Sequence, residues 1–314
     1  MAAERSRAVD LLKLVLALMV VGIHANPFAD LGRSVNLLTG EGIYRLGVPV
    51  FLVFNGYYLQ GALASGRGRA LLARVARLYL IWMLLYLPIY WRLAMHLSWP
   101  ELLRFALFGY WHLWYLAGLT FAVAVLLALR QASDRALLAL ALLTWAGGVA
   151  VTWGMAADLL HPGQPFRDPL LPARNPLFLC LPYVTFGLLI ARRGLVSRVP
   201  ARLASAAALL GVLAVIGESF AISRMGVPTS HDALASLGLA APALALWALA
   251  LPGRTQGRLT GDLANGLYFL HVGFVALLIR HTDLHHALVW ALAVAGSVAL
   301  TLILRRTGLA RHLF

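Results

Sequence analysis

Long runs of apolar residues, with few interruptions, recur along this entire chain. They show neither the two-residue alternation of half-buried strands nor the ~10-residue alternating segments of a membrane β-barrel. Many have the length of about 20 residues that a helix needs to cross a bilayer. The pattern therefore predicts about ten membrane-spanning helices, at about 9–29, 46–64, 75–95, 111–129, 136–156, 173–191, 203–222, 234–251, 261–280 and 286–304.

The composition supports this all-α integral membrane fold. Of the 314 residues, 61% are hydrophobic and only 12% are charged, and the mean hydropathy is +0.81. A water-soluble domain has about a quarter charged residues. The predicted connecting segments are short, so we expect one transmembrane domain over 1–314 and no fused soluble domain. Cys180 is the only cysteine, which excludes an intramolecular disulfide and a cysteine metal site.

The arginines indicate which way the chain crosses the membrane. With the N-terminus inside, every predicted inner segment holds at least two arginines, and inner arginines outnumber outer ones by about two to one. Both termini are therefore predicted to be cytoplasmic, in a multi-pass protein of the bacterial inner (plasma) membrane. The net charge of +14 reflects this topology and contact with anionic lipid. No basic soluble segment is present that would favour a nucleic-acid partner.

Three ionisable residues lie within the first predicted span, namely Asp10, Lys13 and His24. Such residues are costly in a membrane and are candidates for function. Asp10 and Lys13 are close enough in sequence to pair on one helix face. Lys13 and His24 share nearly the same face, separated by roughly 16 Å of helix rise. This spacing predicts a polar stripe that faces a protein-lined cavity; an interfacial ion pair and a merely hydrogen-bonded histidine are the alternative.

Other polar positions within the spans have both a functional and a structural interpretation. Small-residue helix packing explains Gly56 but not the neighbouring Asn55. An aromatic belt at the membrane interface explains Trp114 better than His112. Glu218 lies near the outer end of its span, where its carboxylate could reach water. The candidates for the outer side of a site are Asn55, His112, Trp114, Glu218, Tyr268 and His271.

Arg74 and Arg77 share a helical face at the inner entry to the third predicted span. Two arginines in this arrangement can hold phosphate groups through charge-assisted hydrogen bonds. Positive-inside anchoring is an equally good explanation for them.

These segments together resemble the acyltransferase 3 family of membrane acyltransferases. Arg7, Asp10 and Lys13 followed by His24 resemble the family's basic-x10-His signature, with Lys13 where many members have arginine. Further segments match in the family's order over about residues 5–275: the Gly47–Leu59 segment, Arg74-x-x-Arg77-Leu, His112-Leu-Trp-Tyr-Leu and Tyr268-Phe-Leu-His271. Asn55 stands where the family usually has serine. The C-terminal SGNH-type domain of some members is not expected here.

The resemblance implies a membrane O-acyltransferase that moves an acyl group from cytoplasmic acyl-CoA, with acetyl-CoA as the expected donor, to a hydroxyl at the outer side. Arg74, Arg77 and Lys13 would hold the coenzyme. His24 would act as general base or nucleophile, suited by an unperturbed pKa near neutrality. Asp10 would pair with Lys13 or Arg7, and the six outer candidates would line the acceptor or oxyanion side. No metal is expected.

Two other functions remain open from the sequence. Buried charges, histidines and the proline-broken segment from Pro172 to Pro182 also suit a permease for a small polar solute such as an amino acid. The membrane portion of the vancomycin-type serine racemases, which the chain also resembles, is thought to move serine. A catalytically silent scaffold is the second alternative. The acceptor, whether a glycan, a lipid-linked sugar or a small metabolite, and the oligomeric state are not determined by the sequence.

Overall fold

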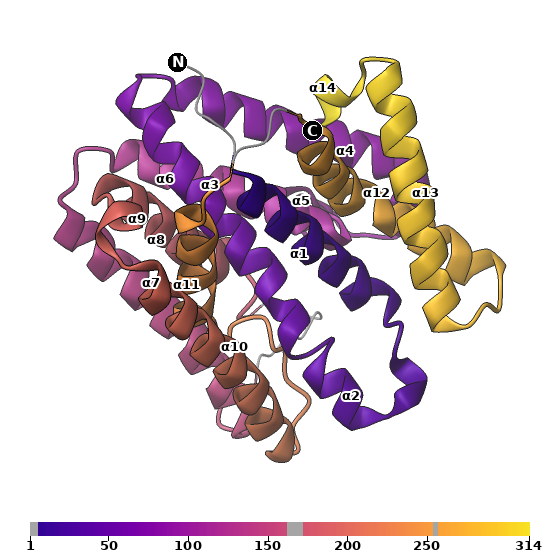
Figure 1. Ribbon diagram of the computed structural model, residues 1–314. Helices are drawn as coiled ribbons and strands as arrows, with labels where there is room; N and C mark the ends of the chain where they lie inside the picture. The colour runs from indigo at the N-terminus through magenta and orange to yellow at the C-terminus, as the bar shows by residue number, and fades with distance from the viewer. Residues whose placement is uncertain (1–5, 162–171, 254–256) are drawn as a thin grey trace.

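The computed structural model describes residues 6–161, 172–253 and 257–314, and in these ranges every regular element is helical (Figure 1). The long helices are α1 (Arg7–Ala25), α3 (Gly47–Ala64), α4 (Gly68–Met95), α6 (Trp114–Ala128), α7 (Asp134–Ala156), α8 (Leu181–Arg192), α10 (Ala201–Arg224), α11 (Leu237–Ala250), α12 (Leu259–His281) and α13 (His286–Arg306). The short elements are η1 (Ala29–Leu31), α2 (Arg33–Leu38), η2 (Ile43–Leu46), α5 (Trp99–Phe108), η3 (Trp111–Leu113), η4 (Pro176–Cys180), α9 (Leu195–Arg198) and α14 (Ala310–Leu313).

Each of the ten predicted spans coincides with one long helix or with a short turn that continues into one. Eight helical segments are long and apolar enough to cross a membrane. The other two, Pro176–Arg192 and Leu237–Ala250, are apolar but shorter. The chain is therefore an all-α, multi-pass membrane protein, as the sequence predicted. The number of ten crossings stays a prediction.

The first span ends earlier than predicted. The sequence pattern extended it to about 29, but α1 stops at Ala25 because Asn26 takes a left-handed conformation with φ of 43°, and Pro27 follows. Asparagine tolerates this conformation better than other non-glycine residues. The chain then forms η1 and α2 before η2 leads into α3. Pro49 lies in the first turn of α3, where its missing N–H costs no helical hydrogen bond.

The closest helix crossing joins α3 and α8 at two glycines. A side chain on Gly56 would collide with the Val184 and Leu188 backbone, and one on Gly187 would collide with the backbone of Val53. Without side chains at these points, the two backbones lie in direct contact, as small-residue interfaces in membranes allow. The packing interpretation of Gly56 is thereby confirmed.

Both described ends of the chain lie at the same end of the bundle, at the top of Figure 1. The Arg7 N–H donates to the Gly253 carbonyl just beyond α11, and Arg74 near the start of α4 donates to the Phe314 carbonyl. At this end Asp262, at the start of α12, also pairs with Arg305 near the end of α13. This arrangement fits two termini on one side of a membrane; the cytoplasmic assignment stays a prediction.

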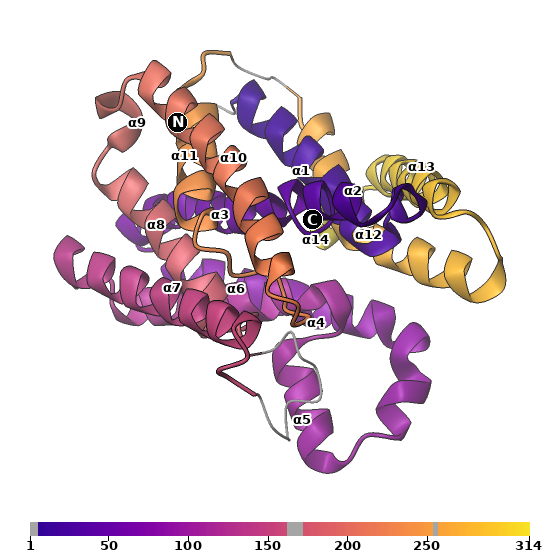
Figure 2. The same ribbon diagram turned by 90° about the horizontal axis from the view of Figure 1, so that it is seen from below.

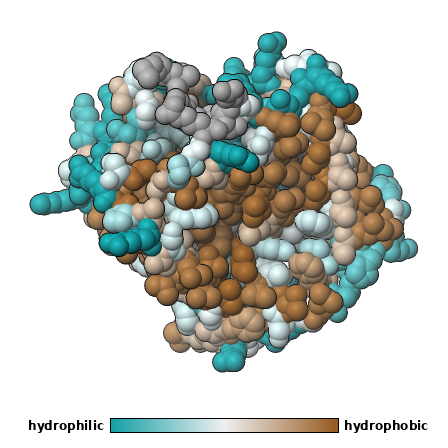
Figure 3. Space-filling view, viewed as in Figure 1, coloured by the Kyte–Doolittle hydropathy of each residue, from teal (hydrophilic) through white to brown (hydrophobic). Residues whose placement is uncertain are grey.

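The exterior matches a lipid environment. In Figure 3, hydrophobic residues cover much of the centre of the visible face and hydrophilic residues gather mainly at its edges. Large apolar side chains such as Leu84, Leu143 and Leu209 are more than 60% exposed, which in water would favour aggregation. One helix stands apart from the bundle: α5 projects to one side, connected to α4 and α6 (Figure 2). The Tyr79 hydroxyl of α4 donates to the Ala106 carbonyl of α5 at 2.6 Å and ties α5 to the bundle.

We expect Gly56→Ala to lower the thermal stability of the purified protein by several degrees, because the added methyl group forces α3 and α8 apart. Gly61→Ala is the matched control, since it lies in the same helix and a side chain there meets nothing within 4 Å. Exchanging glycine for alanine inside a helix favours the helix by about 1 kcal/mol, so the control should melt at the same temperature or higher. Equal melting temperatures for the two variants would show that the crossing tolerates separation.

Candidate active site

Three histidines from three distant parts of the chain meet at the end of the bundle opposite Arg7. The ring centroid of His24 lies 5.2 Å from that of His271 and 6.5 Å from that of His112. The rings of His112 and His271 are 5.3 Å apart. His112 and His271 are buried, whereas His24 is only partly covered. The structure therefore brings together three of the residues that the sequence singled out.

His24 occupies the last turn of α1. The helix ends one residue later, so His24 is at the rim of the bundle instead of in its middle. The edge of the Trp111 ring packs against it, with centroids 5.6 Å apart. The imidazole is thus held by aromatic contacts while one side stays accessible to a substrate.

His112 is positioned by a tight turn between α5 and α6. Gly109 has φ of +84°, and a side chain there would meet the Leu113 and Trp114 backbone. Trp111 has φ of +46°, a left-handed conformation that is rare for a bulky residue and costs about 1–3 kcal/mol. Such strain is concentrated at functional sites. The Phe269 backbone lies near the His112 ring, but neither ring nitrogen has a partner at hydrogen-bond geometry within the described residues.

His271 lies in the middle of α12, and its environment defines its tautomer. Its Nδ1 is 2.7 Å from the Leu267 carbonyl of the preceding turn, so Nδ1 carries the proton and donates it. Nε2 then has the free lone pair of a neutral imidazole, and it has no hydrogen-bond partner among the described residues. Buried polar atoms are nearly always satisfied. The cluster thus holds ring nitrogens that have no hydrogen-bond partner among the described residues.

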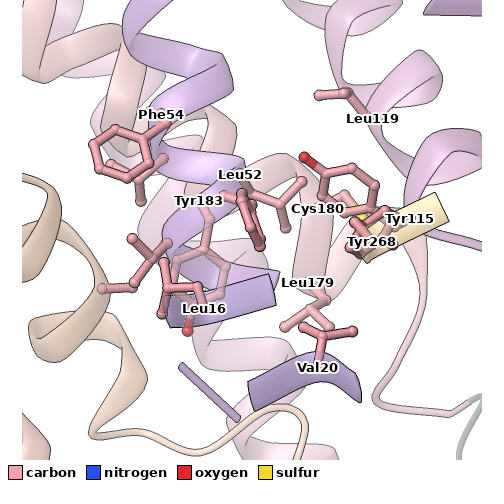
Figure 4. Close-up of a cluster of buried hydrophobic side chains, with 14 of the residues drawn as sticks. Leu16, Val20, Leu52, Phe54, Tyr115, Leu119, Leu179, Cys180, Tyr183 and Tyr268 are labelled. Carbon is pink, nitrogen blue, oxygen red and sulfur yellow. The ribbon is translucent and has the colours of Figure 1, made fainter. Parts of the chain in front are cut away.

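The side chains of Tyr115, Tyr268 and Asn55 form a hydrogen-bonded and packed group next to the histidines. The Tyr268 hydroxyl donates to the His112 carbonyl at 3.0 Å. Tyr115 packs beside Tyr268, with ring centroids 5.2 Å apart and Cys180 next to them (Figure 4). Asn55 donates from Nδ2 to the Tyr115 hydroxyl at 2.6 Å and to the Phe51 carbonyl. Asn55 is therefore connected to the histidines only indirectly, through Tyr115 and Tyr268.

A buried ion cluster stands next to the histidines. Asp232, in the α10–α11 connection, is 2.6 Å from Arg45 and 3.8 Å from Arg174, while Arg45 also binds Glu41 at 2.6 Å. Arg174 in turn covers the Trp114 ring at 5.5 Å. Burial alone raises the pKa of Asp232, but the two arginines and the Ser230 hydroxyl outweigh it and lower the pKa from 3.8 to about 2. The cluster links three segments around the site.

Lys13 and Asp10 lie at the other end of α1. The Lys13 ammonium is 5.3 Å from the Phe54 ring centroid and 5.2 Å from that of Tyr58, within cation–π distance of both α3 rings. Asp10 is buried. The predicted stripe does not form an open path, because Leu16 and Val20 lie between Lys13 and His24 on that face and are at most 2% exposed. Apolar side chains fill the space in which the sequence predicted a cavity.

The remaining predicted residues lie away from the histidines. Arg74 and Arg77 are exposed near the start of α4. Glu218 accepts hydrogen bonds from the Trp153 indole, the Ala235 N–H, and the Ser236 N–H and hydroxyl, all within 2.9 Å. The Glu218 carboxylate thus anchors the start of α11 to α7 and α10. Its assignment to the acceptor side stays a prediction.

A fourth histidine, His231, has a serine and a carboxylate nearby, but the geometry does not suit nucleophilic catalysis. His231 Nδ1 is 3.0 Å from the Ser219 hydroxyl and 3.9 Å from the Glu41 carboxylate. A catalytic triad needs the serine and the carboxylate on opposite ring nitrogens. Ser219 is also fully buried and within hydrogen-bond distance of the Leu37 carbonyl. These residues connect α2 to α10.

Among the described residues, no group of three or more His, Cys, Asp or Glu side chains is arranged to hold a metal ion.

Comparison with known proteins agrees with this geometry. A family model described as an acyltransferase domain, that of the acyltransferase 3 family, matches residues 6–306. The chain belongs to this family. The match includes all three histidines and nearly every helix of the bundle, and it makes the protein a membrane acyltransferase by family. No solved structure matches the chain.

Two curated relatives are similar over shorter stretches. An amino-acid racemase of Enterococcus faecalis is 28% identical over 141 residues, which are 41% of this chain and 20% of the relative. A serine/alanine racemase of Enterococcus gallinarum is 29% identical over 92 residues, which are 27% of this chain and 13% of the relative. The chain thus matches a fifth or less of the length of either relative.

Several residues of the site were not selected as site residues from the sequence. These are Trp111, which packs against His24, and the residues of the ion cluster, Arg45, Arg174 and Asp232. The proximity of Trp111 to His112 was a usable signal. Asp232 and Arg45 are 187 positions apart in the chain, and no local pattern indicates their pairing.

We expect Asp232→Asn to destabilise the protein at neutral pH by about 2 kcal/mol, the free-energy equivalent of the lowered pKa. A carboxyl group with a lowered folded-state pKa contributes stability above pH 4, and this contribution is lost as the pH falls through about 2. Thermal melting at several pH values tests this expectation. The difference between wild type and variant should be full above pH 4 and disappear toward pH 2; a difference independent of pH would contradict it.

Proposed function

We propose that this protein transfers an acyl group, acetyl in the simplest case, from acyl-CoA on the cytoplasmic side to a hydroxyl group at the outer side of the membrane. The acceptor is a glycan or another hydroxylated molecule. The proposal is supported above all by the three histidine rings, whose centroids lie within 6.5 Å of one another, and by ring nitrogens of His112 and His271 that have no hydrogen-bond partner among the described residues. Family membership supports acyl transfer.

The geometry suits either of two roles for His24. As a general base, it removes the proton of the acceptor hydroxyl, whose oxygen attacks the thioester carbonyl and expels coenzyme A thiolate. As a nucleophile, His24 first takes the acyl group, and the hydroxyl then attacks the acyl-imidazole. In the second case Nε2 of the neighbouring His271 is available to accept the hydroxyl proton.

The donor would bind at the opposite end. Arg74 and Arg77 are exposed there, and Lys13 lies against α3, which leads through residues 65–67 into the helix that carries both arginines. These three cations would hold the coenzyme phosphates. To bring the thioester to His24, the pantetheine arm must separate Leu16 and Val20 from their neighbours, because these side chains fill the space along α1.

A permease for a small polar solute is the second candidate, which the buried histidines and the proline-broken segment from Pro172 to Pro182 also suit. A permease needs neither acyl-CoA nor an accessible basic nitrogen. Chemistry on a thioester therefore separates the two functions.

We expect His24→Ala to lower the rate of coenzyme A release from acetyl-CoA by about 100-fold or more, the contribution of a general base or nucleophile. His281→Ala is the matched control, because this exposed histidine lies in α12, the helix of His271. Both variants should remain monodisperse in detergent. A folded His24→Ala variant with the wild-type rate would remove His24 from the mechanism, and wild-type protein inactive toward every acyl-CoA would favour transport. An acetyl group found on His24 by mass spectrometry would identify the nucleophilic role.

We expect the double change Arg74→Gln and Arg77→Gln to raise the KM for acetyl-CoA by about tenfold with little change in kcat, because ground-state charge pairs with phosphate are lost. Arg202→Gln is the control, since it is an exposed arginine at the start of α10. A KM that changes equally in both variants would show that general surface charge, and not these two side chains, attracts the coenzyme.

A further inference from the structure

The buried side chain of Tyr86 joins α4 to α12, the helix that carries His271. This side chain is only 4% exposed. Its hydroxyl donates a hydrogen bond to the Phe269 carbonyl at 2.7 Å and accepts one from the Gly273 N–H at 3.0 Å. The hydroxyl therefore uses its proton and a lone pair on the backbone of α12.

These two hydrogen bonds fall on one step of the α12 backbone ladder. Phe269 and Gly273 are four residues apart, which is the spacing of a carbonyl and an N–H that bond each other in an α-helix. A side chain that enters this ladder is a known cause of local helix bending. His271 lies within the bridged turn, so Tyr86 fixes the backbone that carries its imidazole.

The ring of Tyr86 contacts a second histidine of the cluster. Its centroid is 5.2 Å from that of His112, and the two ring planes meet edge to face at 72°. Such pairs have a preferred orientation, because the positive edge of one ring is attracted to the negative face of the other. The Phe269 backbone, which binds the Tyr86 hydroxyl, also lies near the His112 ring. One side chain thus contacts His112 and holds the turn of His271.

Tyr90 offers a comparison on the same helix. It is 7% exposed, and its hydroxyl donates to the Met83 carbonyl at 2.8 Å. This carbonyl belongs to α4 itself. The Tyr90 ring packs against Phe105 and Tyr110, and within the described residues it makes no ring contact with a histidine. Tyr90 therefore resembles Tyr86 in burial and hydrogen bonding but has no connection to the α12 backbone.

We propose that Tyr86 is a positioning residue for acyl transfer, which holds His112 and His271 in the arrangement that the reaction requires. This inference rests on the proposed acyl transfer at the histidine cluster. The hydroxyl carries the role, because it alone bonds to the α12 backbone. A displacement of a reacting group by about 1 Å can lower a rate by about 100-fold, so a small change in this turn is sufficient to affect the reaction.

The change Tyr86→Phe removes the hydroxyl and leaves an aromatic ring against His112. We expect kcat for coenzyme A release from acetyl-CoA to fall by about tenfold, because the turn of His271 loses its tie to α4. The KM for acetyl-CoA should stay the same, since the donor arginines at the other end of the bundle are unchanged. Tyr90→Phe is the matched control and should keep the wild-type kcat.

NMR of the ¹⁵N-histidine-labelled protein in bilayers gives a second readout that needs no turnover. The signals of His112 and His271 are assigned as those lost in His112→Gln and His271→Gln. We expect the ring-nitrogen signals of both residues to shift in Tyr86→Phe and to stay in place in Tyr90→Phe, since these signals respond to hydrogen bonding and tautomer. A smaller fraction of folded protein would lower kcat without shifting the signals of the folded molecules, so the readout separates positioning from stability.

Three results would overturn the inference: a wild-type kcat in folded Tyr86→Phe, an equal loss of kcat in both tyrosine variants, or a loss of kcat with unshifted histidine signals. The outcome is separable from that of the proposed acyl transfer. Wild-type protein that releases no coenzyme A from any acyl-CoA would refute the proposed reaction. The NMR comparison would then still decide whether Tyr86 holds the two histidines, because shifted signals support that role and unshifted signals refute it.

Discussion

The structure depends on one constraint, which is that a polar group inside a lipid-embedded bundle must find a partner within the protein. Water is not available there to replace a missing hydrogen bond. Asn55 meets the Tyr115 hydroxyl, the Glu218 carboxylate accepts hydrogen bonds from two other parts of the chain, and Asp262 pairs with Arg305. Each pairing joins segments that are distant in sequence. Lipid would solvate the apolar helices equally well in many arrangements. The pairings between polar residues therefore determine which arrangement the helices adopt.

The unsatisfied nitrogens of His112 and His271 are exceptions to this rule. Their neighbours are ordered on all sides: Tyr268 binds the His112 backbone, Leu267 defines the His271 tautomer, and the strained Trp111 turn places the His112 ring. Backbone strain and hydrogen bonds in the surroundings thus hold the two imidazole rings in place, although some of their ring nitrogens have no hydrogen-bond partner among the described residues. This pattern indicates a site that is completed by a substrate, whereas satisfied groups such as Glu218 are structural.

The sequence predicted the helices well because a helix that crosses lipid needs a long, continuous run of apolar residues, which can be recognised in the local sequence. It also singled out His24, His112 and His271, which the structure brings together, because a histidine within an apolar run differs clearly from its neighbours; their roles stay a prediction. It failed where the outcome depends on contacts across the bundle. The pairing of Asp232 with Arg45, and the hydrogen bonds of Glu218 to α7 and to the start of α11, join segments that are distant in sequence and leave no local pattern. The end of α1 was placed too late because the left-handed Asn26 interrupts an otherwise apolar stretch.

The packed middle of α1 adds a condition on any reaction that uses both ends of the bundle. An open channel between Lys13 and His24 would let water and ions cross the membrane, and Leu16 and Val20 close that route. Under the proposed function, only the slender thioester arm needs to pass them, while the charged coenzyme head stays with the arginines at the far end. Separating two apolar side chains around an arm that is itself narrow disturbs far fewer contacts than opening a pore for a solute. The same packing that contradicts the predicted cavity is thus better suited to acyl transfer than to transport of a polar molecule.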